Sequence, residues 1–280
     1  MRPFVVRAAG LARRGALLLS IALPSFAQAL AEGPRPGPSA QKKGPTPLPE
    51  GPAARLEQLR TLPPAALAEQ LRQTPPGELV LLGREGVRRL GTYRARLIKQ
   101  ERVEGRVRPP QTLEIIVRPE PRAIRLEYVE GPKAGRKVLW TAARPRQILV
   151  REAGILGLAS IWLDVDGSLA HGDTNHDATD LGFGPLLDIV ERDLRKAAPH
   201  GGHRRQDEGF DAAGNYCLTF TAPAGAAGLY AARTRLCLDP RLALPVQIEV
   251  QDGAGFLERY HYTQVRAHQT VDPLLLTEIQ

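Results

Sequence analysis

The stretch from Gly91 to Gly135, GTYRARLIKQERVEGRVRPPQTLEIIVRPEPRAIRLEYVEGPKAG, decides the fold. Apolar and mainly polar side chains alternate in three successive segments of it, at 93–97, 113–118 and 124–128, with Ile116 as the apolar exception on the second face. A period of two residues places one set of side chains on a dry face of a sheet and the other set in water. We therefore expect three consecutive antiparallel strands, and their dry face needs further strands and a cover.

The same alternation recurs later in the chain. Asp252-Gly253-Ala254-Gly255 is typical of a tight turn between two strands. The patterns together predict about nine to eleven strands. Residues 200–209 are expected to form a loop, whereas 155–164 fit either a strand or a line of buried loop residues. The expected strands outside the opening stretch are 136–142, 147–151, 215–222, 230–239, 245–251 and 256–267.

Helices are expected mainly before the first strand. Leucines recur there at helical spacing, and the pairs Pro63-Pro64 and Pro75-Pro76 break the pattern between successive helices. A later helix carries one apolar stripe and has Pro185 at its start. We expect the helices to pack on the sheet, with a mobile gate as the alternative. The expected helices span 53–61, 65–73, 77–90 and 185–198.

The start of the chain has the composition of a secretory signal peptide. Arginines precede the apolar run from Gly15 to Leu23, and Ala27-Gln28-Ala29 fits a small-x-small cleavage site. The run is shorter than the about 20 residues that span a membrane, so we expect a periplasmic protein without a transmembrane span. Arg13-Arg14 leaves general and twin-arginine export both open. The expected divisions are a signal peptide at 1–29, a Pro/Gly-rich linker at 30–52, a single α+β domain at 53–270 and a C-terminal tail at 271–280.

The charge of the chain does not indicate a nucleic-acid partner. The formal net charge is +8, and cleavage after Ala29 removes four arginines and no acidic residue, which leaves 8 − 4 = +4. A mildly basic mature surface is not the footprint of a nucleic-acid binding protein.

Cys217 and Cys237 are the two cysteines of the chain. Each lies on an expected strand between inward-facing residues, so both are expected on the outer face of one antiparallel pair. In an oxidising compartment the simplest expectation is a disulfide between them. The absence of a C-x-x-C spacing gives thioredoxin-like chemistry no support.

Ionisable residues cluster in one Gly-rich polar loop, at 164–184. Histidines and carboxylates there could bind zinc or supply acid–base groups, but their spacing matches no metal motif and the loop has no Cys. The preferred explanation is that short polar side chains of the loop hydrogen-bond the backbone in turns and cap the following helix. We therefore expect no metal and no cofactor. The polar candidates are His171, Asp173, Asn175, His176, Asp177 and Thr179.

Three phrases of the sequence resemble a bacterial family, the "domain of unknown function 1571". They are Tyr93-x-Ala-x-Leu-x-Lys-Gln-Glu101, Gly131-Pro-Lys-Ala-Gly135 and Asn175-His176-x-x-Thr179-x-x-Gly182-x-Gly184. More distantly, the layout is similar to the LolA/LolB superfamily of envelope lipoprotein carriers. That resemblance implies an α+β fold in which a strongly curved antiparallel sheet forms an incomplete barrel, with helices covering its concave side.

The resemblance also implies a function without catalysis. We expect a monomeric envelope protein that binds or carries a hydrophobic or lipid ligand in a half-barrel. An envelope protein-interaction or sensory module without lipid is the first alternative, and a metal-dependent hydrolase is the second. No catalytic residue is proposed. The residues expected to line the ligand are Tyr93, Leu97, Leu113, Ile115, Leu126, Tyr128, Leu218 and Phe220.

Overall fold

The computed structural model describes residues 51–154, 159–167, 174–267 and 273–279. The expected signal peptide and nearly all of the expected linker lie outside these residues. The contacts divide the chain into Met1–Thr46 and Pro47–Gln280, and all described residues belong to the second unit.

The helices of the described chain begin close to where the proline pattern predicts. Each of the first three starts at a proline, which leaves no unpaired amide at the first helical position. No helix among the described residues has the length and apolarity to cross a membrane. The helices are α1 (Pro52–Thr61), α2 (Pro64–Gln73), α3 (Pro76–Leu90) and α5 (Phe183–Ala197), with 3-10 turns η2 (Ala178–Asp180), η3 (Ala198–His200) and η4 (Pro273–Leu276).

Twelve described strands form one open antiparallel sheet in the order β7-β6-β5-β4-β3-β1-β12-β11-β10-β9-β8, with β2 paired to β1. The fold is therefore the expected α+β class. The strands are β1 (Tyr93–Val103), β2 (Arg106–Val107), β3 (Gln111–Arg118), β4 (Ala123–Glu130), β5 (Lys137–Thr141), β6 (Gln147–Arg151), β7 (Ile161–Asp164), β8 (Arg204–Phe210), β9 (Tyr216–Thr221), β10 (Arg233–Asp239), β11 (Leu244–Asp252) and β12 (Gly255–Ala267).

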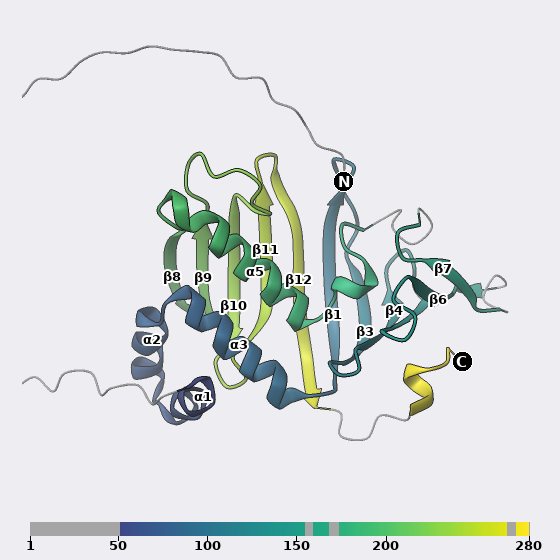
Figure 1. Ribbon diagram of the computed structural model, residues 1–280, viewed down its shortest axis with the longest axis horizontal. Helices are drawn as coiled ribbons and strands as arrows, with labels where there is room; N and C mark the ends of the chain where they lie inside the picture. The colour runs from purple at the N-terminus through teal and green to yellow at the C-terminus, as the bar shows by residue number, and fades with distance from the viewer. Residues whose placement is uncertain (1–50, 155–158, 168–173, 268–272, 280) are drawn as a thin grey trace, which may run out of the picture. The chain divides into compact units, whose positions relative to one another are not determined.

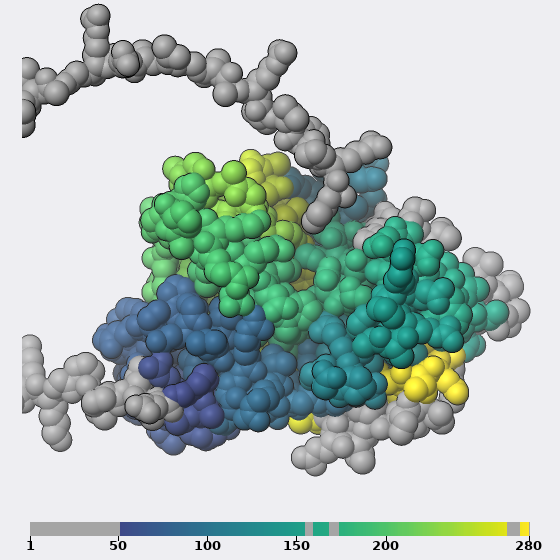
Figure 2. All heavy atoms as spheres, in the orientation of Figure 1, coloured from purple at the N-terminus to yellow at the C-terminus, as the bar shows by residue number. Residues whose placement is uncertain are grey.

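Two meanders meet at the centre of the sheet. The first runs from β1 to β7 and the second from β8 to β12, and the antiparallel pairing of β1 with β12 joins them. The inner side chains of strands near opposite ends of the sheet, such as Val150 on β6 and Phe220 on β9, belong to one apolar core. The sheet therefore curves around that core, and α3 and α5 cross its concave side in front of β8–β12 (Figures 1 and 2).

Two glycines let α3 pack closely against α5 and against the turn between β10 and β11. A Cβ on Gly86 would lie 2.0 Å from the backbone oxygen of Leu242, in the turn between β10 and β11. A Cβ on Gly83 would lie 2.8 Å from a methyl group of Leu187 on α5. Glycine inside a helix lowers its intrinsic stability, and here the loss is offset by the close approach of three elements.

Two expectations about the second meander are wrong. Residues 200–209 do not form a loop, because β8 begins at Arg204. The inward residues of β8 are polar since they meet the end of α2: Arg205 donates to the carbonyl oxygens of Thr74 and Leu71 at 2.6 and 2.8 Å. A cation at the C-terminal end of a helix is favourable, but it hides the apolar alternation by which a strand is recognised. The strand expected from Tyr230 starts only at Arg233.

The end of the chain packs on the outer face of the first meander. Leu276 and Ile279 are buried there against Ile116 and Leu139. The buried Arg125 donates to the carbonyl oxygens of Leu275 and Glu278. Residues in the expected C-terminal tail therefore cover an apolar patch on the convex side.

Candidate functional site

The inner face of β1 changes from apolar to charged halfway along the strand. The alternation that places Tyr93 and Leu97 in the core also places Lys99 and Glu101 there, and both are buried. In the pairing of β1 with β12, Glu101 lies opposite Glu258 and Lys99 lies opposite Tyr260. Two carboxylates thus face each other inside the protein, which is unfavourable unless cations neutralise them.

Two cations neutralise this pair of carboxylates. Lys99 Nζ lies 3.0 Å from Glu101 Oε2. His176, on the loop before α5, lies with Nε2 3.1 Å from both carboxylate oxygens of Glu258. Thr174 Oγ1 accepts a hydrogen bond from Lys99 Nζ at 3.0 Å. Through Thr174 and His176, the loop therefore contacts both Lys99 and Glu258.

His176 is held in its charged form. Burial by itself would lower the pKa of His176, but the Asp180 and Glu258 carboxylates that face its ring raise this pKa to about 10. The ring also lowers the pKa of Asp180, whose Oδ2 is 3.8 Å from Nδ1. At neutral pH His176 is an imidazolium whose two nitrogens both face carboxylates, so it lacks the free lone pair that a general base needs.

Two tyrosines complete the cluster. Tyr230 OH lies 2.8 Å from His176 Nε2, and Tyr260 OH donates to Glu101. Burial, and then the charge of Glu258, raise the pKa of both phenols above the usual value. Both hydroxyls therefore keep their protons and serve as neutral hydrogen-bonding groups.

The same strands fix the first turn of α5. Tyr262 OH accepts a hydrogen bond from Gly182 N at 3.3 Å, and Tyr93 OH accepts one from Phe183 N at 3.1 Å. These phenols take the place of a side-chain cap, which α5 lacks. Gly182 has φ +100 and a Cβ there would lie 2.8 Å from Tyr93 OH, so the position requires glycine.

Beyond its first turn, α5 covers an apolar cavity of ≈ 40 Å³ over strands β9–β12. Its apolar stripe on this side is only half-buried, although the helix faces the sheet. The volume holds no more than a few water molecules, so side chains fill most of the interior. The lining consists of Leu186, Ile189, Val190, Asp193 and Leu194 from α5 and of His203, Phe220, Tyr230, Thr234, Leu236, Ile248, Val250 and Glu258.

A wider and more polar groove of ≈ 520 Å³ lies on the other side of α5. Arg192 and Arg195 line it together with His176 and Asp180. Ile189 and Tyr230 belong to the lining of both spaces, so the polar groove and the apolar cavity meet at these residues.

The expected ligand-lining residues are distributed between a solid core and two small cavities. Phe220 lines the cavity under α5, whereas Leu126 and Tyr128 line a second cavity of ≈ 30 Å³ in the first meander. The other five expected lining residues lie in the packed core, and their role in binding stays a prediction. They are Tyr93, Leu97, Leu113, Ile115 and Leu218.

The polar loop candidates divide in a similar way. His176 enters the buried cluster and Asn175 lines the polar groove. Asp177 lines the second cavity, and the carbonyl oxygen of Thr179 accepts from Arg122 at 2.6 Å. His171 and Asp173 lie outside the described residues.

Sequence reasoning did not propose most of the charged cluster. Continuing the alternation of β1 past Leu97 would have placed Lys99 and Glu101 on the dry face, and the same argument applies to Glu258 and Tyr260 on β12. Nothing local marks Tyr230, because it reaches the cluster from outside a regular element.

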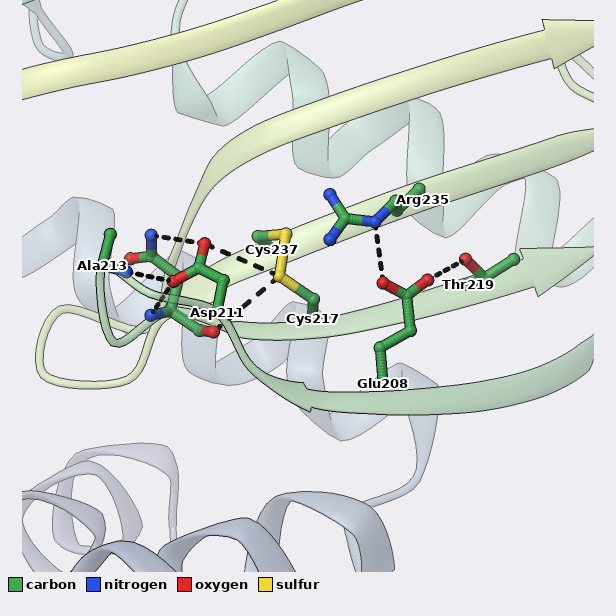
Figure 3. Close-up of a disulfide and its surroundings, with 8 residues drawn as sticks. Glu208, Asp211, Ala213, Cys217, Thr219, Arg235 and Cys237 are labelled. Carbon is green, nitrogen blue, oxygen red and sulfur yellow. Dashed lines mark hydrogen bonds and ion pairs between the residues drawn. A yellow bond between two sulfur atoms is a disulfide. The ribbon is translucent and has the colours of Figure 1, made fainter.

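Cys217 and Cys237 form a disulfide between opposite residues of β9 and β10 (Figure 3). The bridge lies on the outer face, away from the cluster, and the turn at Asp211 lies beside it. Closing a loop of this length stabilises the fold by about 3 kcal/mol in the chain-entropy model. The described residues contain one group with the spacing of a metal site, Asp211 with these two cysteines, and its sulfurs are joined to each other.

The fold is similar to several solved structures at low sequence identity. The lipoprotein LppX of Mycobacterium tuberculosis is 16% identical with a TM-score of 0.42, over 74% of this chain and 99% of that chain. A LolA superfamily protein of Nitrosomonas europaea is 10% identical with a TM-score of 0.31, over 69% and 96%. MucA/MucB of Pseudomonas aeruginosa gives 17% identity and a TM-score of 0.38, over 68% and 59%.

Comparison at the level of sequence gives one family match. No match to a curated protein sequence was found. Residues 90–275, from the end of α3 to the C-terminal segment, match the model of a family described as "Protein of unknown function (DUF1571)". The matched range includes both the charged cluster and the cavity under α5. Since the match covers more than half of the chain, the protein belongs to the DUF1571 family.

Proposed function

We propose that the protein is an exported, non-enzymatic binding module of the cell envelope that holds an apolar ligand between α5 and strands β9–β12. The observation that carries this proposal is the half-buried apolar stripe of α5 over an apolar cavity. Half-buried apolar side chains forgo part of the hydrophobic stabilisation that full burial gives. A bound hydrocarbon would bury them and gain about 0.8 kcal/mol per methylene.

The anchoring of α5 indicates how the cavity can enlarge. The N-terminal end of the helix is fixed by Tyr93, Tyr262 and the buried Phe183, whose ring stacks on Tyr93 at 5.2 Å. The stripe from Leu186 to Leu194 is less buried. A small outward swing of α5 about its fixed end would open the cavity, and Tyr230, whose N–H donates to Asp193 Oδ2 at 2.9 Å, would move with the helix.

The polar groove suits the other end of an amphiphile. Arg192 and Arg195 line the groove together with Asp180 and Asp188. Arg195 also lies 3.3 Å from Glu191. A ligand whose chain lies under α5 could therefore place an anionic head group against these guanidinium groups.

The chemistry of the cluster supports binding rather than catalysis. Asp180 and Glu258 hold His176 in its charged form, and Lys99 is engaged in an ion pair with Glu101. The disulfide and the signal-like start of the chain support export to an oxidising compartment.

Binding of a fluorescent fatty acid, 11-(dansylamino)undecanoic acid, tests this function. We expect saturable binding to the wild-type protein and at least tenfold weaker binding to Leu194→Trp, which fills the cavity. Ile98→Trp is the control, because Ile98 is exposed on the outer face of β1. Wild-type protein that binds no probe, or a Leu194→Trp variant that binds it as well as wild type, would overturn the proposal.

One observation favours an interaction module as the second candidate. Strand β7 forms an edge of the sheet, and it exposes Ile161 and Trp162. An edge strand with exposed apolar side chains can pair with a strand of another protein. Affinity capture that recovers one stoichiometric partner from wild type, and loses it with Trp162→Lys, would favour this alternative.

A further inference from the structure

Two residues that line the cavity under α5 each carry a buried polar atom that has no hydrogen-bond partner among the described residues. These atoms are Oδ1 of Asp193 and Nδ1 of His203. Asp193 is 7% exposed as a residue, and its other oxygen, Oδ2, accepts a hydrogen bond from Tyr230 N at 2.9 Å. The nearest cation to Oδ1 is Arg192, whose Nε is 3.8 Å away, beyond hydrogen-bonding distance.

The other charged group of the cavity is already neutralised. Glu258 lines the same cavity, but its carboxylate faces the imidazolium of His176. Tyr230 OH is likewise engaged by His176. Among the described residues of this lining, Asp193 and His203 are therefore the ones that carry a buried polar atom without a partner.

His203 can serve as donor or acceptor. Burial lowers its pKa below the usual value, although the charge of Asp193 opposes this effect. The ring is therefore neutral at neutral pH. Its Nδ1 carries a proton in one neutral tautomer and lacks it in the other, so this atom can donate or accept. Its ring packs edge-on against Phe220, with centroids 6.1 Å apart, so its position in the apolar wall is defined.

A hydroxyl group fits this pair of atoms better than a charged group does. A hydroxyl donates one hydrogen bond and accepts another, so it can donate to Asp193 Oδ1 while accepting from His203 Nδ1. A carboxylate on the ligand would be repelled by Asp193, and an ammonium group would lose far more hydration than a hydroxyl on entering an apolar cavity. Leaving a buried carboxylate oxygen unpaired is costly, so the free protein gains by taking up such a donor.

We propose that Asp193 Oδ1 and His203 Nδ1 recognise a hydroxyl group on an otherwise apolar ligand, such as a long-chain alcohol, bound under α5. The inference rests on the proposed function, because the hydrocarbon part of the ligand must occupy the cavity. It adds a chemical class, since a hydrocarbon of the same size without the hydroxyl would leave both atoms unpaired.

Two matched ligands test this proposal with the full chain. 1-Decanol carries the donor, and 1-methoxydecane keeps the oxygen but lacks the O–H. We expect displacement of the dansyl probe by decanol at a concentration about tenfold or more below that needed for the ether, the ratio typical of one hydrogen bond to a charged group.

The Asp193→Asn variant supplies a second measurement. Its amide oxygen can still accept from Tyr230 N, which directs the NH₂ group to the position of Oδ1. An NH₂ group donates to alcohol and ether alike, so we expect the preference for decanol to fall to near one while the probe still binds. Glu208→Gln on the outer face is the control, and thermal unfolding confirms that each variant is folded.

The outcomes are distinguishable. If alcohol and ether displace the probe equally from the wild-type protein, or if Asp193→Asn keeps the full preference, the recognition of a hydroxyl is wrong and the apolar site stands. If neither ligand nor the probe binds, the proposed function fails, and this inference fails with it.

Discussion

At the scale of single residues, His176 supplies positive charge to the buried carboxylates at the centre of the sheet. Glu101 and Glu258 face each other across β1 and β12, and His176 supplies one of the two cations that neutralise them. The cost of a buried carboxylate is offset only while its partner stays charged. His176 therefore couples the loop before α5 to the centre of the sheet, and that coupling depends on a proton.

Replacing His176 by Gln should change both stability and its dependence on pH. The pKa of His176 is raised to about 10 in the folded protein, so its stabilisation is complete below the unfolded value of about 6.5 and is lost as pH rises toward 10. Wild-type unfolding free energy should fall across this window by up to about 1.4 kcal/mol per pH unit more than that of His176→Gln.

Urea unfolding at several pH values, with the exposed His200→Gln as the control, measures this difference. Below pH 7 we expect His176→Gln to be about 3–5 kcal/mol less stable than wild type, the usual result of removing one partner of a buried ion pair. Parallel pH profiles for wild type and His176→Gln would contradict the assignment of the proton to His176.

At the scale of elements, the two long helices are positioned by residues that would be unusual in free helices. Gly83 and Gly86 bring α3 against Leu187 of α5 and Leu242 of the turn after β10. The N-terminal end of α5 is capped by phenols from the sheet rather than by its own side chains. Helix positions here are thus fixed by close backbone approach, and the cavity lies beyond the fixed first turn of α5.

Gly86→Ala should displace α3. The added methyl group would lie 2.0 Å from the carbonyl oxygen of Leu242, a backbone atom that cannot turn aside. We expect a loss of about 1–3 kcal/mol or more, the range found when a packed interior is overfilled. Gly77→Ala in the first turn of the same helix meets no atom within 4 Å and should be neutral or stabilising. Equal unfolding midpoints for the two variants would show that the contact is not restrictive.

At the scale of the whole described unit, stability depends on joining segments that are distant in sequence. The pairing of β1 with β12 joins the two meanders, and the C-terminal residues return to cover the outer face of the first one. Both unions bury apolar surface that neither meander can bury alone.

Deleting residues 273–280 should expose an apolar patch on the convex side. Ile116, Leu139 and Leu149 would lose their cover, and the buried Arg125 would lose the two carbonyl oxygens that it contacts. We expect lower stability and increased fluorescence of an apolar dye, whereas removal of Gln280 alone should have neither effect. Unchanged dye binding after the longer deletion would contradict the structural role of this segment.

Periodicity explains why much of the fold is predictable. Strand β1 alternates buried and more exposed residues along its length, and proline pairs mark the starts of α2 and α3. These signals are local, so they survive without knowledge of the partners. The outward position of Cys217 and Cys237 follows from the same alternation. Strand β8 was missed because its inward Arg205 is satisfied by the end of α2, a contact that no local pattern encodes.

The sequence by itself determined the position of most strands and helices, because periodicity and proline breaks depend on residues within a few positions of one another. The resemblance of three separate phrases indicated the family, and with it the class of the fold. Only the tertiary structure decided that β1 pairs with β12, that Glu101, Glu258, His176 and Tyr230 form one cluster, and that Asp193 and His203 line one cavity. These groups come from segments up to about 160 residues apart, as in the bond between Tyr260 and Glu101. Burial and charge compensation bring them together, and both are properties of the packed chain rather than of any segment in it.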